Sequence, residues 1–260
     1  MSEQHSTALT QAPRVGAWVT LDSIVATEQI SRAGFDYVCI DGQHGLLGYD
    51  AQVRALVAIA AGGAVPFARV STNSAAEIGR VLDAGARGVI VPLIDSAVEA
   101  RKAALAARYP TSGGSRSFGP MRLGPHFSAT PAETDASVTV LAMIETESGL
   151  GEVEAILDVD GVDGVYVGPY DLSLALGARV QFEDAILPLL DEELDRVIAA
   201  AKERGKIAGV HCADGLQAAR RAEQGFTFIT AATDVSSLRA DMALQLGNAR
   251  GLGADLGRAY

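Results

Sequence analysis

The sequence predicts an α/β fold of the (β/α)8 TIM-barrel type, built as a single domain over residues 1–260. Eight strand-like runs alternate with amphipathic helical patterns, and such alternation is typical of a parallel sheet covered by helices. The length fits, because a barrel of this type typically needs about 250 residues. Four of the runs also share a Gly-apolar-Asp frame, which begins at Gly34, Gly85, Gly161 and Gly225.

The strands are predicted by runs of β-branched residues that Gly or Asp residues bound. In chain order they cover residues 15–20, 37–40, 65–70, 88–91, 138–144, 162–167, 207–210 and 226–229. The shared frame falls on every second strand. That rhythm favours a closed barrel over an open doubly wound sheet, in which central and edge strands differ.

Helices are predicted between the strands, where apolar residues recur with a helical period. They cover residues 23–33, 49–61, 74–84, 96–107, 149–157, 192–204, 215–223 and 236–246. Ser74 and Glu77 have the spacing of a capping box, in which each side chain bonds the backbone amide of the other residue.

One stretch, residues 109–137, has no clear periodicity. Loops of this length within a compact domain are usually functional or disordered. The stretch carries Arg116, Arg122 and His126. We expect it to cover the carboxyl rim of the barrel or a neighbouring subunit, with a plain surface excursion as the alternative.

The net charge and the distribution of apolar residues limit the classes of partner that the chain could bind. A net charge of −11 argues against nucleic acid or an anionic membrane surface as a partner. No apolar run approaches the roughly 18 residues of a membrane span, and residues 1–13, expected to be flexible, lack an apolar signal region. We therefore expect a cytoplasmic protein in which Cys39 and Cys212 are reduced thiols.

Two acidic residues stand at the ends of successive strands, Glu145 after the fifth and Asp171 after the sixth. Neighbouring strands lie about 4.8 Å apart, and two carboxylates at that spacing would repel by roughly 3 kcal/mol. Either one is protonated or a cation lies between them. A hard divalent ion such as Mg²⁺ suits oxygen ligands and keeps several waters. The alternative is that both residues cap the helical turns that follow them.

Other polar residues are expected at the same rim. Asp41 and His44 follow the second strand, and Arg69 ends the third. Each has an ordinary alternative: Asp41 could bond turn amides, His44 could be a surface loop residue, and Arg69 could pair with a helix carboxylate. The three lysines, at 102, 202 and 206, lie in helices or at the amino end of a strand, which argues against imine chemistry.

Four motifs resemble those of the HpcH/HpaI family of class II, metal-dependent 2-oxo acid aldolases, which includes aldolases of 4-hydroxy-2-oxoheptanedioate and of 2-dehydro-3-deoxy sugar acids. They are FDYVCIDGQHG at 35–45, PFARV at 66–70, LAMIET at 141–146 and DGVDGVYVGPYDLSLALG at 160–177. The last is the most specific. The resemblance covers nearly the whole chain.

The resemblance implies roles for particular residues. Glu145 and Asp171 would bind a divalent cation, Mg²⁺, Mn²⁺ or Co²⁺, and Arg69 would contact the 2-oxo oxygen of the substrate. His44 and Asp41 would form an acid–base dyad. The remaining implied contacts are backbone amides around Gly168, Pro169 and Tyr170 for the substrate carboxylate, and Trp18 near the aldehyde pocket.

The resemblance also implies an assembly. Asp83 would reach a histidine of a neighbouring subunit in a homohexamer, a dimer of trimers in which the last helix is exchanged between subunits. Two positions depart from the family pattern: Gln43 stands where relatives usually carry Glu, and Met143 where they carry Gln. We expect these departures to change substrate contacts while the reaction is kept.

The implied reaction is the reversible aldol cleavage of a 4-hydroxy-2-oxo acid into pyruvate, or hydroxypyruvate, and an aldehyde. His44 is the natural base for the alcohol proton, because the pKa of histidine can lie near neutrality. Two other functions stay open. One is a lyase of CoA thioesters of the citrate lyase β or malyl-CoA lyase type, and the other is a non-catalytic barrel that binds an oxo acid.

Overall fold

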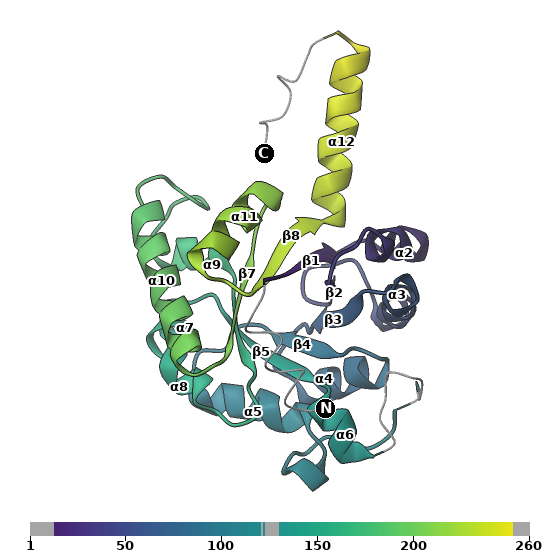
Figure 1. Cartoon of the computed structure of the whole chain (residues 1–260), viewed down its shortest axis with the longest axis vertical. Coiled ribbons are helices and arrows are strands. Elements are labelled where there is room, and N and C mark those ends of the chain that lie inside the picture. Colours follow the sequence, from purple (N-terminus) through teal and green to yellow (C-terminus); the bar gives the residue numbers. More distant parts are fainter. Residues whose placement is uncertain (1–12, 121, 123–129, 252–260) are drawn as a thin grey trace.

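The computed structural model describes residues 13–120, 122 and 130–251, and its strands form a closed parallel barrel (Figure 1). Each strand pairs with the next, and β8 closes the ring by pairing with β1. The predicted (β/α)8 barrel is therefore confirmed, and the open-sheet alternative is wrong.

The strands are β1 Arg14–Val19, β2 Tyr37–Asp41, β3 Val65–Arg69, β4 Gly88–Val91, β5 Thr139–Ile144, β6 Gly164–Val167, β7 Ile207–His211 and β8 Phe228–Thr233. The largest errors of prediction are at β6, which begins two residues later than expected, and at β8. The β8 strand was expected to end at Ile229 but continues to Thr233. Its last residues, Ala231 to Thr233, include small side chains that carry no strong strand signal.

The helices are α2 Ile24–Arg32, α3 Tyr49–Gly62, α4 Ala75–Asp83, α5 Ala97–Ala107, η1 Pro110–Ser112, α6 Pro131–Ala136, α7 Glu147–Gly151, α8 Val153–Leu157, α9 Pro169–Ala175, α10 Leu187–Glu203, α11 Gly215–Gln224 and α12 Asp234–Ala249. The single helix expected at 149–157 is two short helices, because the backbone leaves helical geometry at Glu152 (φ −101°, ψ 8°).

The capping box predicted at Ser74 is wrong. The Ser74 side chain makes no cap hydrogen bond, although Ser74 does precede α4. Glu77 instead accepts hydrogen bonds from the Ser71 amide, the Ser71 hydroxyl and the Thr72 amide, so it closes the loop after β3.

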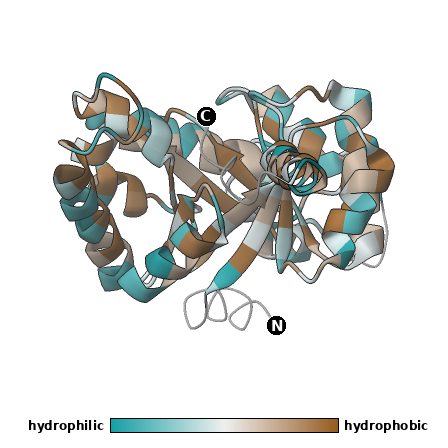
Figure 2. Cartoon of the chain, turned by 90° about the horizontal axis from the view of Figure 1, so that it is seen from above, coloured by the Kyte–Doolittle hydropathy of each residue, from teal (hydrophilic) through white to brown (hydrophobic). Residues whose placement is uncertain are grey.

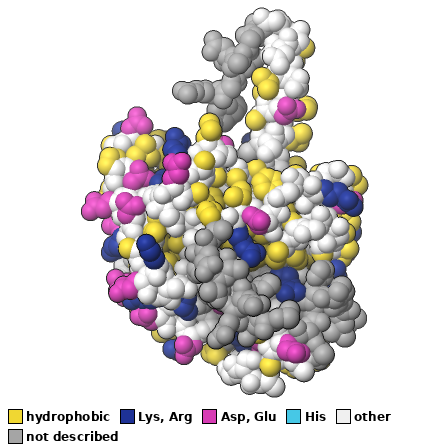
Figure 3. All heavy atoms as spheres, viewed as in Figure 1, with side chains coloured by type: hydrophobic (Ala, Val, Ile, Leu, Met, Phe, Trp, Pro, Cys, Tyr) yellow, Lys and Arg dark blue, Asp and Glu magenta, His cyan; other side chains and the backbone are white. Residues whose placement is uncertain are grey.

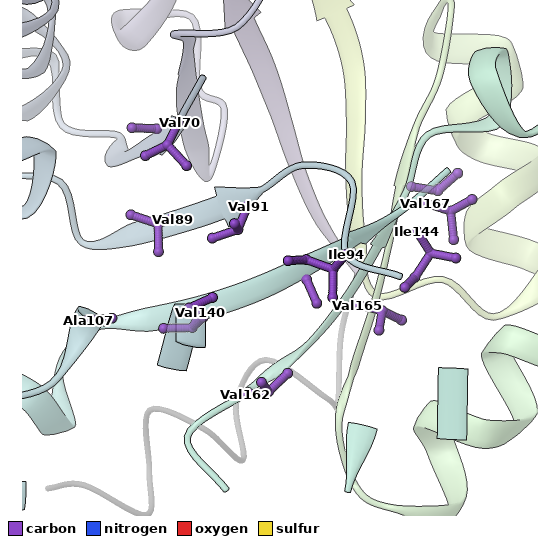
Figure 4. Close-up of a cluster of buried hydrophobic side chains, with 14 of the residues drawn as sticks. Val70, Val89, Val91, Ile94, Ala107, Val140, Ile144, Val162, Val165 and Val167 are labelled. Atoms are coloured by element: carbon purple, nitrogen blue, oxygen red, sulfur yellow. The ribbon is translucent and has the colours of Figure 1, made fainter. Parts of the chain in front are cut away.

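Two layers of side chains stabilise the barrel. Alternate strand residues point inward and outward, and the inward set fills the barrel with rings such as Tyr37, Phe67, Tyr166 and Phe228. The outward set packs against the helices in a second cluster (Figure 4). Hydrophilic residues lie mainly on the outer sides of the helices (Figure 2). Gly16 makes room inside, since a Cβ there would lie 2.3 Å from the Tyr37 ring.

The described parts of the stretch 109–137 lie at the amino ends of the strands, while residues 121 and 123–129 lie outside the described residues, so the covering role of this stretch stays a prediction. It joins the end of α5 to the start of β5, and both lie at the amino ends of the strands. Arg116 donates a 2.6 Å hydrogen bond to Asp83, and Arg122 donates to the Ala84 carbonyl at the same end. His126 lies outside the described residues.

Helix α12 begins against β1 and β8 and then projects away from the barrel (Figure 1). Gly247 is its only buried residue, and it exposes four large apolar side chains (Figure 3), namely Leu238, Met242, Leu244 and Leu246. Within the described residues, no helix of the chain has the length and apolarity needed to cross a membrane.

Candidate active site

Arg69 and Asp41 form a buried ion pair at the carboxyl ends of β3 and β2. The two residues are direct partners in the strand register, so their side chains leave the sheet on the same side. Arg69 donates from Nε to Oδ1 at 2.9 Å and from Nη2 to Oδ2 at 2.8 Å. Burial raises the pKa of Asp41, but the hydrogen bond and charge of Arg69 outweigh it and hold the pKa below its ordinary value. Asp41 is therefore ionised and fixes the guanidinium plane.

The predicted dyad of Asp41 and His44 is not formed within this chain. Asp41 Oδ1 accepts from the backbone amides of Gln43 (3.0 Å) and His44 (3.2 Å), while the His44 side chain is exposed. Both carboxylate oxygens are thus occupied by Arg69 and the turn, as the ordinary alternative for Asp41 expects. His44 does lie at the carboxyl rim, in the loop after β2.

Glu145 follows β5 and is buried, with 4% of its surface exposed. Its Oε1 accepts a 2.8 Å hydrogen bond from the Leu93 amide, which the positive φ of Leu93 (53°) turns toward it. Burial is the largest effect on Glu145 and raises its pKa. The Leu93 amide and Arg69 act against that rise, and the nearby charge of Asp171 adds to it. A buried carboxylate with a second one nearby is a group that a cation would stabilise.

Asp171 lies in the first turn of α9, exposed and without a hydrogen bond from a described residue. The capping alternative is wrong for both acidic residues. Thr146 caps α7, and α9 begins at Pro169 after Gly168, with no side-chain cap. Both carboxylates are thus left available for another partner.

The space beside Glu145 depends on Gly168. A Cβ at Gly168 would lie 3.0 Å from Glu145 Oε2 and 2.7 Å from the end of Met143. Carboxylate oxygens at an open rim are donors that a hard divalent cation accepts. In the stretches 13–120, 122 and 130–251 no group of three or more His, Cys, Asp or Glu side chains could hold a metal, so a site here would draw at most two ligands from those side chains.

Of the backbone amides expected to bind a carboxylate, two are not available. The Gly168 amide donates to the Ile144 carbonyl at 3.0 Å, and Pro169 has no N–H. The amides of Tyr170 and Asp171 belong to the first turn of α9, where N–H groups have no partner inside the helix. These two can bind an anion beside Glu145.

Trp18, on β1, lies inside the barrel against Arg69. The Arg69 Cζ is 4.6 Å from the indole centroid, and Nη1 of Arg69 also contacts the Met143 sulfur at 3.8 Å. The indole is 2% exposed, and its Nε1 has no hydrogen-bond partner. A flat apolar wall therefore supports the guanidinium, and Met143 occupies the rim between Arg69 and Glu145.

His211, at the end of β7, is a polar residue of this rim that the sequence did not single out. Its ring lies edge-on to Trp18 at 4.7 Å, and its Nδ1 is 3.2 Å from the Tyr166 hydroxyl. Burial and the charge of Arg69 lower the pKa of His211 to about 4. The imidazole is neutral at pH 7. The signal that could have found it is its place at a strand carboxyl end, like Arg69.

Asp83 is not part of this group in one chain. It ends α4, at the amino ends of the strands, and pairs there with the buried Arg116. The chain thus brings together Trp18, Asp41, Arg69, Glu145, Gly168, Pro169, Tyr170 and Asp171 at one rim with His44 in the adjoining loop, and places Asp83 at the opposite end.

The chain is similar to known proteins over nearly its whole length. Residues 14–240 match the model of the HpcH/HpaI aldolase/citrate lyase family. The hydroxypyruvate/pyruvate aldolase of Rhizorhabdus wittichii is 38% identical over 251 residues, covering 92% of this chain and 95% of that relative. The 5-keto-4-deoxy-D-glucarate aldolase of Salmonella paratyphi C is 32% identical over 233 residues, covering 88% and 90%.

Among solved structures, an HpcH/HpaI aldolase/citrate lyase family protein from Burkholderia cenocepacia superposes with a TM-score of 0.85 at 30% identity. The superposition covers 95% of this chain and 99% of that one. The likeness in sequence and in fold therefore extends over the same elements that carry the rim residues.

Proposed function

Because the chain belongs to the HpcH/HpaI aldolase/citrate lyase family, as its motifs predicted, we propose that it is a metal-dependent aldolase. It reversibly cleaves a 4-hydroxy-2-oxo acid into pyruvate, or hydroxypyruvate, and an aldehyde. The aldolase activities for which its relatives from Rhizorhabdus and Salmonella are named support this reaction class. The observation that carries the proposal is the buried Glu145 beside the charge of Asp171, with Arg69 acting on the same carboxylate.

Glu145 and Asp171 are the residues that would hold a divalent cation, Mg²⁺, Mn²⁺ or Co²⁺. Their oxygen ligands fit such an ion, and Gly168 leaves the space beside Glu145 free of a side chain. When bound, the ion acts as a Lewis acid toward a 2-oxo acid.

Arg69 stabilises the negative charge that develops on the 2-oxo oxygen. Asp41 holds its guanidinium before substrate arrives, so little reorganisation is needed as the charge forms. Removal of one such donor typically costs about 10² to 10³ in turnover. The amides of Tyr170 and Asp171 donate hydrogen bonds to the substrate carboxylate, and Trp18 borders the aldehyde half.

His44 moves the proton of the reaction. In cleavage its imidazole removes the proton from the 4-hydroxyl as the C3–C4 bond breaks, the electron pair of that bond passes to the 2-oxo oxygen at Arg69, and C3 then takes up a proton as pyruvate forms. In synthesis the imidazole returns a proton to the aldehyde oxygen. Since Asp41 is occupied by Arg69, the partner that orients His44 comes from another subunit. Asp83 of a neighbouring chain fills that role in the assembly that the family resemblance implies.

We further propose that the chain forms a homohexamer, a dimer of trimers that exchanges α12. Four large apolar side chains on this helix are exposed in the single chain, and burial of that surface would favour association. The mass in solution, measured by light scattering for the full chain and for a Met242→Asp variant, tests the exchange. A hexamer in both samples would mean that this face of α12 contributes nothing.

The reaction is tested by release of pyruvate from 4-hydroxy-2-oxo acids, measured with lactate dehydrogenase. Activity should vanish after exhaustive EDTA treatment and return with Mn²⁺. Full activity in EDTA, or an adduct of enzyme and pyruvate trapped by borohydride, would contradict the proposal. If the chain is an aldolase, His44→Ala should still bind the oxo acid while pyruvate release stops. If the chain is a barrel that only binds an oxo acid, wild-type protein releases no pyruvate and His44→Ala changes nothing. Release of product from a CoA thioester alone would indicate the other lyase class.

A further inference from the structure

A row of hydroxyl groups crosses the inside of the barrel and ends on His211. The Tyr37 hydroxyl lies 2.9 Å from Thr230 Oγ1, which lies 2.6 Å from the Tyr166 hydroxyl. That hydroxyl lies 3.2 Å from Nδ1 of His211. Tyr37, Thr230 and Tyr166 are each at most 1% exposed, so the row is closed to bulk solvent. Together these three residues form what we call the hydroxyl row.

The hydrogens of the hydroxyl row can be counted. Two contacts join the three hydroxyls and a third joins Tyr166 to His211, and each of the three contacts takes one hydrogen. Burial raises the pKa of Tyr37 and of Tyr166, so both phenols keep their hydrogens. The three hydroxyl hydrogens therefore fill the three contacts when Tyr37 donates to Thr230, Thr230 to Tyr166, and Tyr166 to Nδ1.

The opposite arrangement leaves a buried donor without an acceptor. If Nδ1 carried a hydrogen, four hydrogens would compete for three contacts, and one hydroxyl in the row would go unpaired. None of the three hydroxyls has another hydrogen-bond partner among the described residues. An unpaired donor sealed from water destabilises the fold, so this arrangement is disfavoured.

We propose that the hydroxyl row fixes His211 as the Nε2–H tautomer, so that its imidazole presents one uncharged hydrogen-bond donor at the rim for a hydroxyl of the aldehyde half of the substrate. This deepens the proposed function and rests on it. His211 and Arg69 both contact Trp18, at 4.7 Å and 4.6 Å, so the donor lies across one indole from the residue that receives the 2-oxo oxygen.

The donor is uncharged, so it offers a hydrogen bond without the ion-pair attraction that would favour a charged oxygen. Nε2 has no hydrogen-bond partner in the chain as described, and it is not among the unpaired atoms sealed from solvent. The neutral ring cannot form an ion pair, because the pKa of His211 lies near 4. A site built to bond a hydroxyl discriminates against an analogue that lacks it, since the donor is then left unpaired. Hydroxylated aldehydes are the class of acceptor that this residue favours.

The tautomer is tested by ¹⁵N solid-state NMR of protein labelled at histidine, with the His211→Gln spectrum used to assign the His211 signals. We expect a protonated Nε2 and an unprotonated Nδ1 at neutral pH. Tyr166→Phe keeps the ring and removes the donor, so the second tautomer should appear in its spectrum. A protonated Nδ1 in the wild type, or an unchanged spectrum for Tyr166→Phe, would overturn the proposal.

The selectivity is tested with glycolaldehyde and propanal, which differ by a hydroxyl in place of a methyl group. The ratio of their kcat/KM values, with pyruvate as the common nucleophile, should fall about tenfold in His211→Leu, a change of about 1.4 kcal/mol. In His211→Gln, which keeps an N–H at similar reach, the ratio should stay within about twofold of wild type. An equal fall for both aldehydes in His211→Leu would overturn the proposal. If neither aldehyde reacts with wild-type protein, the aldolase function fails instead, and the NMR result still decides the tautomer.

Discussion

Replacement of Asp41 by Asn tests whether Asp41 positions Arg69. Asp41→Asn keeps the shape of the side chain and can retain its Oδ1 bonds to the turn amides and to Arg69 Nε. At the second position, an amide donor replaces the oxygen that accepts from Arg69 Nη2 at 2.8 Å. Two donors then face each other, and the buried Arg69 guanidinium loses the carboxylate to which it is bonded.

The cost can be worked out from the burial of the pair. Arg69 is 6% exposed and Asp41 3%, and breaking a buried pair from one side typically costs about 3 to 5 kcal/mol. The retained Oδ1 bonds favour the lower end, about 3 kcal/mol. A domain of this size loses roughly 2 to 4 °C in Tm per kcal/mol, so we expect a Tm lower by about 6 to 12 °C. Turnover should fall by about 10²-fold, because the donors of Arg69 are misplaced.

The assay pairs calorimetric melting with pyruvate release, and Glu28→Gln is the control. Glu28 forms an exposed pair with Arg32 at 2.9 Å, and exposed pairs contribute little. The pKa of Asp41 lies below its ordinary 3.8, so its contribution is complete above pH 3.8 and is lost as the pH falls through the folded value. The Asn variant should lack this acid-dependent loss. Normal turnover together with a lowered Tm would refute the positioning role, and an unchanged Tm would refute the energetic one.

Three further outcomes follow from the same rim. Arg69→Ala should lower turnover by about 10²-fold or more. Arg69→Lys should not restore turnover, because lysine cannot make the bidentate contact with Asp41. Near-normal turnover of either variant would remove Arg69 from the chemistry. Burial raises the pKa of Glu145, so ionisation of Glu145 lowers the stability of the fold as the pH rises through the pKa of the folded state. Glu145→Gln without metal should therefore melt at a higher temperature than metal-free wild type at pH 7. The same variant should lose the rise in Tm that Mn²⁺ gives the wild type. Gly168→Ala should weaken Mn²⁺ binding in a titration by about tenfold with an intact circular dichroism spectrum, since its Cβ meets Met143 and Glu145; unchanged affinity would mean that the space is not used.

The rim could be predicted from the sequence because its residues share one property, a position at the carboxyl end of a strand. Glu145 directly follows one predicted strand and Arg69 ends another, and parallel strands of a closed barrel bring such ends together. What the sequence did not predict is which side chains pair. Asp41 bonds Arg69 and not His44 because the β2–β3 register places Asp41 opposite Arg69.

The other errors have similar causes. His211 was missed because the expected β7 ended one residue before it, and the last residue of a strand is where patterns of hydrophobicity are weakest. The covering role of the stretch 109–137 stays a prediction, because residues 121 and 123–129 lie outside the described residues; its described ends lie at the amino ends of the strands, as expected for a connection from a helix to the following strand. Ser74 and Glu77 have capping-box spacing, but the Glu77 carboxylate accepts its hydrogen bonds from the preceding loop at Ser71 and not from Ser74.

The central claim is that Glu145 and Asp171 hold one divalent ion that a 2-oxo acid can share. Crystals grown with Mn²⁺ and pyruvate, measured at the manganese absorption edge, test it most directly. We expect one anomalous peak per chain, bounded by both carboxylates, with the pyruvate oxygens on its open side and Arg69 facing the 2-oxo oxygen. A peak elsewhere, or pyruvate bound at the rim while neither carboxylate touches manganese, would contradict the account.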